Sequence, residues 1–573
     1  MIYGPKILFI CIILMYCLSC NSNPKADLVI RNAKIVTVDS LLPRAQALAV
    51  TGDRISFVGN NEQVNQYISD NTRVIDLQGK LVIPGFIEGH AHFIALGKAK
   101  MNLDFTNVKN WDEVIAMVRQ TVKKAEPGDW IIGRGWHQEK WDRMPDQTAE
   151  GYPVHNHLSR ISPDNPVMLT HASGHALFAN AKAMEIAGIQ KSSTDPEGGR
   201  IVRQANGMPS GIFLENAEEL IQQAYNKWHS SLSQEQQRHE LIKAIELASE
   251  ECLSKGITGF QDAGQPFEII DLYKNLAEKG KLDIRLWVMI LESNDRLSSE
   301  IDRYKIINDG NYFLTVRSIK KYMDGALGSR GAWLLEPYSD MPSTSGLNTT
   351  SLDEFRKTAQ IANEHGFQLC THAIGDRANR EVLNVYEKTS TANPEKSNLR
   401  WRIEHAQHLN SLDIPRFAQL GVIASMQGIH CTSDGPWVLK RLGDKRAEEG
   451  AYVWKKLLNS AAIVSNGTDA PIEDVDPIAN YYALVTRKMK NGKAFYPAQA
   501  LTRDEALKVS TLNCAFAAFE EDIKGSITVG KLADLVILSQ DILTVPDEQI
   551  NQTKVLYTIL GGKIKYQFDG GIQ

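Results

Sequence analysis

Residues 84–92 read PGFIEGHAH and complete an apolar run that begins at residue 81. On an extended chain, residues two positions apart point the same way, so His90 and His92 can present two imidazoles to one metal ion. Similar short apolar runs follow, and most spacers between them have helical patterning. With 81–87, these runs are 257–261, 284–290, 316–323, 367–371, 400–404, 421–426 and 462–466. Eight such strands alternating with helices predict an α/β fold, a (β/α)8 TIM barrel.

Ligand-type side chains follow three more of these predicted strands. His372 lies in THAIGDR, His405 in RIEHAQ and Asp469 in NGTDAP. The C-terminal strand ends of a TIM barrel meet at one mouth, where such barrels build their active sites. A hydrogen-bonded structural imidazole would explain any one of these histidines, but the set in register predicts a metal site.

The remaining sequence predicts accessory parts around a barrel at residues 81–500. Strand-like runs near both chain ends predict one small β-sandwich, built from residues 21–80 and from residues 501–573, which also hold a barrel-closing helix. The gap at residues 93–255 is too long for one crossover. We therefore expect a large insertion after the first strand, a subdomain that covers the barrel mouth.

Residues 1–20 have the features of a signal peptide. Lys6 precedes an apolar run at residues 7–18, and Ser19 and Cys20 follow it. That run suits a signal-peptide core and is short for a membrane span. We expect a bacterial lipoprotein acylated at Cys20, attached to the cell envelope and facing the periplasm or exterior. Cys17 departs from the usual signal, so a plain secretory signal or an uncleaved anchor stays open.

Charge and cysteine usage limit the function classes. A net charge of −5 gives no broad basic field for a phosphate backbone, so we expect no nucleic-acid partner. Four of the seven cysteines lie outside the leader, widely scattered and without CxxC spacing, and we interpret them as buried small hydrophobes. They are Cys252, Cys370, Cys431 and Cys514.

Beyond the leader, the chain resembles the amidohydrolase superfamily, and within it the amidohydrolase 3 branch of YtcJ-like, N-substituted-formamide-deformylase-like proteins. The marks of this branch are PGFIEGHAH, KKYMDGALGS, HAIGDRA, RIEHAQ, TDAP and, near the end, GSI with GKLADLV. The resemblance implies a metal-dependent hydrolase of non-peptide carbon–nitrogen bonds, which acts through a metal-activated hydroxide on a small-molecule amide.

The resemblance also implies roles for individual residues. His90, His92 and Asp469 would hold one divalent ion, and His372 and His405 would hold a second. Lys320, four residues before an Asp-Gly pair, would be carboxylated and bridge the two ions. Asp469 would also be the catalytic proton shuttle. The ligand types favour two Zn²⁺, with manganese, iron or cobalt as alternatives.

Substrate contacts are predicted on two further segments. In the insertion, His175 and His137 lie in segments similar to family segments that overhang the mouth, although they would equally serve to join the insertion to the barrel. After the seventh strand, Gln427, His430 and Asp434 match a pocket-facing family segment, and His430 would orient a substrate oxygen. Trp136, Trp141 and Trp437 would wall an aromatic pocket or lie in the core.

Two other functions stay open at this point. The same metal site would support a cyclic amide or imide hydrolase, since the linear-amide interpretation rests on the resemblance alone. A non-enzymatic, metal-binding surface protein is the alternative from another class, and it would be marked by lost ligands. The sequence leaves open whether the chain forms a homo-oligomer.

Overall fold

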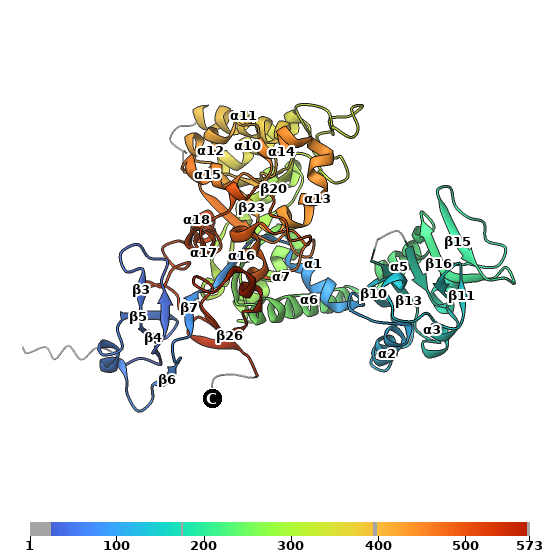
Figure 1. Ribbon diagram of the computed structural model, residues 1–573, viewed down its shortest axis with the longest axis horizontal. Coiled ribbons are helices and arrows are strands. Elements are labelled where there is room, and N and C mark those ends of the chain that lie inside the picture. The colour runs from blue at the N-terminus through green and yellow to red at the C-terminus, as the bar shows by residue number, and fades with distance from the viewer. Residues whose placement is uncertain (1–24, 173–175, 393–397, 570–573) are drawn as a thin grey trace, which may run out of the picture.

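The computed structural model describes residues 25–172, 176–392 and 398–569. At its centre, eight parallel strands lie side by side in chain order. They are β8 (Phe86–Ala91), β17 (Ile257–Gln265), β18 (Arg285–Ile290), β20 (Leu314–Tyr322), β21 (Gln368–Ala373), β22 (Arg402–His405), β23 (Ile423–Gln427) and β24 (Val464–Gly467). Two of them, β20 and β23, are labelled in Figure 1. The first and last strands meet beyond β24, where the Asp469 amide donates to the His90 carbonyl at 2.8 Å. The predicted TIM barrel is confirmed.

Amphipathic helices surround this sheet. Helix α10 (Leu352–His365) begins where the Ser351 side chain accepts from the Glu354 amide, and it ends at Gly366, whose φ of 66° suits glycine. Its buried positions pack into the same core as those of α11 (Asp376–Ala392). The polar strand ends are thus held by a rigid apolar frame.

One predicted boundary is wrong. Residues 81–84 form a separate strand, β7 (Leu81–Pro84), which pairs with β25 (Leu535–Leu538) and β2 (Lys34–Val36) outside the barrel. Gly85 is the switch between the two sheets. A Cβ there would lie 2.1 Å from the Thr258 Oγ1, so only glycine lets the chain pass this closely into β8.

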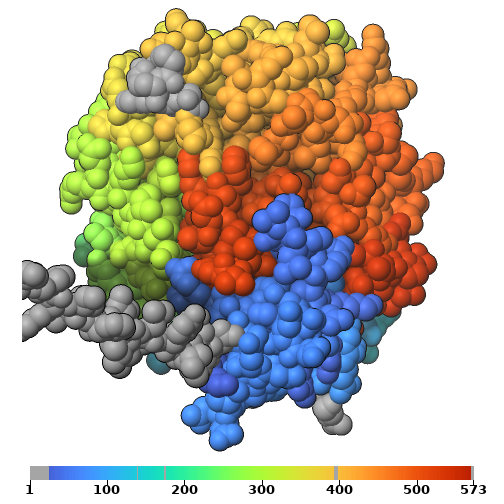
Figure 2. All heavy atoms as spheres, turned by 90° about the vertical axis from the view of Figure 1, so that its left-hand side faces the viewer, coloured from blue at the N-terminus to red at the C-terminus, as the bar shows by residue number. Residues whose placement is uncertain are grey.

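The two ends of the chain share one sheet, as predicted. Its strand order is β27-β26-β25-β7-β2-β3, in which β26 (Val555–Leu560) and β27 (Lys563–Gln567) come from the C-terminal end and β3 (Arg44–Ala45) from the N-terminal end. A second sheet, β5-β4-β1-β6, adds β5 (Arg54–Gly59), β4 (Ala47–Thr51), β1 (Leu28–Arg31) and β6 (Arg73–Asp76). In Figure 2 the blue N-terminal residues lie against red C-terminal ones. A buried ion pair at 2.8 Å between Arg285 and Asp534 joins this unit to the barrel.

The long gap after the first strand forms a separate lobe. Its sheet has the order β15-β16-β14-β13-β10-β9. These strands are β15 (Gly199–Arg203), β16 (Pro209–Glu215), β14 (Ala176–Ala179), β13 (Val167–His171), β10 (Ile131–Trp136) and β9 (Leu103–Asp104). Helices α1 (Phe93–Met101) and α6 (Gln234–Ser254) pack together and carry the lobe away from the barrel (Figure 1). The helices pack so closely that a Cβ at Gly97 would lie 1.9 Å from the Ala244 carbonyl oxygen.

The predicted signal peptide and Cys20 lie outside the described residues. Within the described part of the chain, none of the helices has the length and apolar character needed to cross a membrane. The four cysteines predicted to be buried are buried and free, which confirms that prediction.

Candidate metal centre

The barrel brings the predicted ligands together at its mouth. His92 and Asp469 meet with 3.3 Å between Nε2 and Oδ1, and the His90 Nε2 lies 3.7 Å from the same oxygen. The Lys320 Nζ is 3.4 Å from the His90 Nε2. Residues separated by several hundred positions in sequence therefore share one small volume.

The other two predicted ligands lie on the adjoining side. The His405 ring centroid is 4.8 Å from that of His90 and 4.5 Å from that of His372. Two groups of three residues each have all their ligand atoms within 4.8 Å of one another. One group is His90, His92 and Asp469, and the other is His405, His430 and Asp469. His430, predicted as a substrate contact, thus comes as near to Asp469 as a ligand does, and Asp469 belongs to both groups.

Two ligands have a left-handed backbone. The φ angle is 73° at His405 and 60° at Asp469. Residues with a Cβ rarely adopt such angles, which cost free energy and persist where the surrounding structure imposes them. Here they turn both side chains inward at the ends of their strands.

Hydrogen bonds fix the orientation of the His90 ring. Its Nδ1 lies 2.5 Å from a Glu404 carboxylate oxygen, and Glu404 in turn accepts two hydrogen bonds from Arg402, at 2.7 and 3.0 Å. All three side chains are buried. A carboxylate at Nδ1 selects the tautomer with the proton there, which leaves the Nε2 lone pair facing the mouth.

The same arrangement recurs on the other side. The His405 Nδ1 donates to the Gln427 Oε1 at 2.7 Å, which again frees the Nε2 lone pair. The Gln407 amide contacts the His430 Nδ1 at 3.2 Å. The His372 Nε2 lies 3.5 Å from the Asp324 Oδ1. Oxygen acceptors at Nδ1, as at His90 and His405, orient metal ligands and raise their basicity.

Burial sets the charge states of the ligands. It lowers the pKa of His90 to about 4 and that of His372 to about 3, so both imidazoles are neutral at pH 7. Burial opposes ionisation of Asp469, but its contact with His92 and the nearby imidazoles hold its pKa below the ordinary value. Burial also lowers the pKa of Lys320. Neutral imidazoles and an ionised carboxylate are the forms that bind metal.

Three buried polar atoms at the mouth have no hydrogen-bond partner within the described residues: the Nε2 atoms of His372 and His430 and the Oδ1 of Asp469. Such atoms are costly to bury unpaired. A divalent cation would satisfy the His372 nitrogen and the Asp469 oxygen, and imidazole plus carboxylate is a donor set that suits zinc. The residues present therefore fit a metal ion.

A cavity of about 330 Å³ opens beside these ligands. Apart from the ligands, its lining includes Tyr322, Gln407, Asp434, Trp437 and Glu473. All its lining residues come from the barrel and its loops. The expectation that the insertion covers the mouth is therefore wrong for the described residues, because α1 and α6 hold the lobe to the side (Figure 1).

The insertion histidines lie apart from this cavity. The His137 ring is 4.6 Å from that of His171 within the lobe, and His137 is absent from the cavity lining. His175 lies outside the described residues. Trp136 and Trp141 belong to the apolar core of the lobe, so only Trp437 of the three predicted tryptophans walls the cavity.

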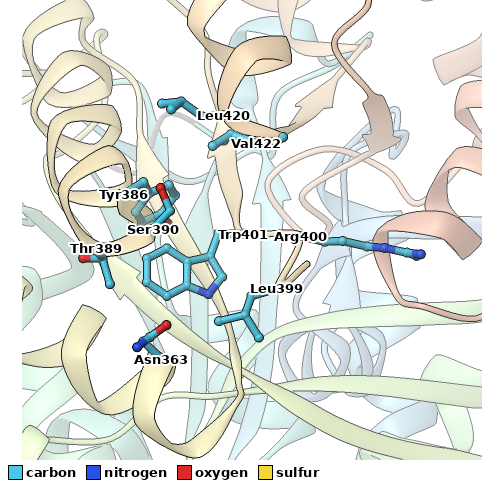
Figure 3. Close-up of a pocket in the computed structure, with 10 residues that line it drawn as sticks. Asn363, Tyr386, Thr389, Ser390, Leu399, Arg400, Trp401, Leu420 and Val422 are labelled. Atoms are coloured by element: carbon cyan, nitrogen blue, oxygen red, sulfur yellow. The ribbon is translucent and has the colours of Figure 1, made fainter. Parts of the chain in front are cut away.

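A second pocket lies toward the opposite ends of the barrel strands, between helices and the starts of β22 and β23 (Figure 3). Tyr386 and Trp401 form part of its wall. Its volume is only about 40 Å³, against about 330 Å³ at the barrel mouth, and the described residues that line it include no histidine or carboxylate. The barrel mouth is the better candidate for catalysis.

Several residues that surround the site are not among the ligands and substrate contacts predicted from the sequence. Glu404 directly precedes a predicted ligand, and its place two residues after Arg402 on one strand was an available signal. Glu88 accepts from the His90 and Thr468 amides, which ties the first strand to the last. Burial raises the pKa of Glu88 to about 7. The contacts of Asp324 and Glu473 had no comparable signal, because they depend on loops.

Comparison with known proteins agrees with this geometry. Residues 73–566 match the amidohydrolase family. The chain is 33% identical to Protein LONG AFTER FAR-RED 3 of Arabidopsis thaliana, across 94% of this chain and 92% of that protein. It is 31% identical to the putative amidohydrolase YtcJ of Bacillus subtilis (strain 168), across 91% and 96%. It is 28% identical to the N-substituted formamide deformylase of Arthrobacter pascens, across 95% and 99%.

A solved structure shows the same fold. The crystal structure of an uncharacterized metal-dependent hydrolase from Pyrococcus furiosus has a TM-score of 0.70 and 27% identity, covering 90% of this chain and all of that one. The barrel, its ligand-bearing strand ends and these similarities define a metal-dependent hydrolase of carbon–nitrogen bonds. The chain belongs to the amidohydrolase family.

Proposed function

We propose that the protein hydrolyses a linear, non-peptide amide, with Asp469 as the proton shuttle. The observation that carries this proposal is the place of the Asp469 carboxylate, buried between two histidine groups with one oxygen lacking a hydrogen-bond partner. The named activity of the Arthrobacter pascens relative, a deformylase of N-substituted formamides, supports a small acyl group on a substituted nitrogen.

Two divalent ions, zinc by donor type, fit the ligands best. His90, His92 and Asp469 would hold one, and His372 and His405 the other. Lys320 lies beside His90 in a fully buried position, where an amine that has lost its proton can react with carbon dioxide to form a bridging carbamate. When bound, such ions lower the pKa of water and polarise the substrate carbonyl.

The chain's own groups move the proton and orient the substrate. Asp469 takes a proton from the attacking water and passes it to the leaving nitrogen, which must depart as an amine because an amide anion is too basic. The free Nε2 of His430 faces the same cavity and is placed to hydrogen-bond the substrate carbonyl oxygen.

Asp469→Asn tests this function directly. With N-formyl and N-acetyl arylamines and zinc present, we expect the variant to lose about 10²- to 10⁴-fold in kcat, the range for a removed general acid–base group. Asp474→Asn is the control, since that exposed carboxylate pairs with Lys255. Unchanged turnover in Asp469→Asn would refute the shuttle, and a zinc-loaded wild type that hydrolyses no amide of the panel would refute the function.

We also propose that the mature protein is a lipoprotein of a bacterial cell envelope, anchored through Cys20. The apolar run at residues 7–18 followed by Ser19 and Cys20 supports this proposal. Labelled palmitate should be incorporated into the wild type and not into Cys20→Ser. Equal labelling of both proteins would contradict the anchor.

A further inference from the structure

One wall of the cavity carries negative charge beside an aromatic ring. Asp434 and Trp437 lie three residues apart on α13 (His430–Leu442), a spacing that places them on one face of the helix. Glu473 follows β24 and lines the same cavity. Burial raises the pKa of Asp434, and the charge of Glu473 raises it further, which places the two carboxylates within electrostatic reach.

This wall has no opposite charge of its own. Lys320 is the only lysine or arginine among the described residues that line the cavity, and it belongs to the metal centre. The Tyr452 hydroxyl donates to Asp434 at 2.6 Å, and His430 on the same helix lies within electrostatic reach of Asp434. Glu473 has no ion pair among the described residues.

Trp437 adds a surface that favours cations. An aromatic face attracts a positive charge within about 6 Å of the ring centroid. The Arg441 guanidinium already lies 5.8 Å from this ring, but it is held outside the cavity by Asp340 and the Gly328 carbonyl. The Trp437 ring and the two carboxylates line the cavity together, where a ligand can meet them.

A second feature of the cavity, besides Asp434 and Glu473, indicates that a ligand binds there. The His430 Nε2, on the first turn of the same helix, is buried without a hydrogen-bond partner in the described part of the chain and lines the same cavity. A substrate that meets this nitrogen through its carbonyl oxygen would extend its remaining part along the wall of Asp434, Trp437 and Glu473.

We infer that the amide substrate carries a cationic group, an ammonium or a similar amine, which Asp434, Glu473 and Trp437 bind. This inference rests on the proposed function and names its substrate class. A substrate carboxylate would meet two carboxylates and no free guanidinium, the group that usually pairs with it. N-acyl amino acids are therefore disfavoured.

Three matched substrates test the inference: N-formylbenzylamine unsubstituted, with a para aminomethyl group and with a para carboxylate. We expect kcat/KM to fall from the cationic to the neutral to the anionic substrate, by about five- to tenfold at each step. Glu473→Gln should reduce the preference for the cation about fivefold, whereas Glu448→Gln, which removes a charge outside the cavity, should leave it unchanged.

A binding measurement distinguishes failure of this inference from failure of the proposed function. Calorimetry with the same three amides gives their affinities even if none is hydrolysed. Tighter binding of the cation that weakens in Glu473→Gln would support the inference, whatever the turnover. Equal binding of all three, or tighter binding of the anion, would overturn it.

Discussion

Two groups of histidines in this molecule look alike in sequence and differ in structure. At the barrel mouth, His90 and His405 each direct one ring nitrogen to a side-chain oxygen, of Glu404 and of Gln427. In the insertion, His137 and His171 lie ring to ring beside Trp136, at the edge of an apolar core. Burial, followed by the charges of His137 and Lys140, lowers the pKa of His171 to about 4.

The difference shows what makes buried imidazoles into a metal centre. Among the described residues of these two places, the barrel mouth combines oriented rings with a carboxylate within reach. Acceptors at Nδ1 decide which nitrogen keeps its lone pair, and strand geometry directs those lone pairs to one point. The insertion pair has aromatic neighbours in the lobe.

Replacing two histidines in each place should produce the largest difference in activity. The double variant His90→Asn/His92→Asn should lose metal and more than about 1,000-fold in kcat/KM, since a bound metal accounts for several kcal/mol of catalysis. His137→Asn/His171→Asn should stay within about threefold of the wild type. Circular dichroism would verify folding of both. Comparable losses of kcat/KM in the two variants would contradict the difference between the two places and show that the insertion reaches an active site.

Glu404→Gln should weaken the metal centre without removing a ligand. The amide no longer favours the same His90 tautomer and leaves Arg402 without its buried partner, so we expect metal affinity to fall about 10- to 100-fold. Competition with a chelator measures this affinity. Glu520→Gln is the matched control, because Glu520 is equally buried and pairs with Lys524 at 2.6 Å. Equal metal affinity in Glu404→Gln and the wild type would mean that Glu404 does not orient His90.

A third type of buried histidine should appear in the pH dependence of stability. His408 is buried with neither ring nitrogen hydrogen-bonded within the described residues, and burial lowers its pKa to about 3. Below pH 6.5, His408 binds a proton in the unfolded chain but stays neutral in the folded protein. Stability present above pH 6.5 is therefore lost progressively as the pH falls towards 3, by about 2 kcal/mol at pH 5.

Urea unfolding of metal-free protein at pH 7.5 and pH 5 measures this loss. His408→Gln should lose about 2 kcal/mol less than the wild type between these two pH values. An identical pH dependence in both proteins would show that His408 is protonated in the folded state.

The strand ends, and the candidate ligands that the barrel brings together there, could be located from the sequence because they depend on local patterns. His90 and His92 needed only the alternation of an extended chain, and the eight runs needed only apolar spacing. The split at Gly85 could not be predicted, because β7 and β8 form one continuous apolar run and separate only through contacts with distant strands.

The supports of the site were hidden for a similar reason. The spacing of Arg402 and Glu404 on one strand was a signal for those two residues, but it does not indicate that Glu404 contacts His90, 314 positions earlier. The position of the insertion depends on how α1 packs on α6, a tertiary contact whose direction the sequence does not indicate. Side chains placed by the pattern of a single strand could be predicted, whereas contacts between segments distant in sequence could not.

The most direct test of the metal centre is the metal content of the purified protein, measured by elemental analysis after reconstitution with zinc and removal of free ion. The ligand arrangement predicts close to two zinc ions per chain, and close to none in His90→Asn/His92→Asn with Asp469→Asn added. A wild type that retains no metal would contradict the account of the barrel mouth.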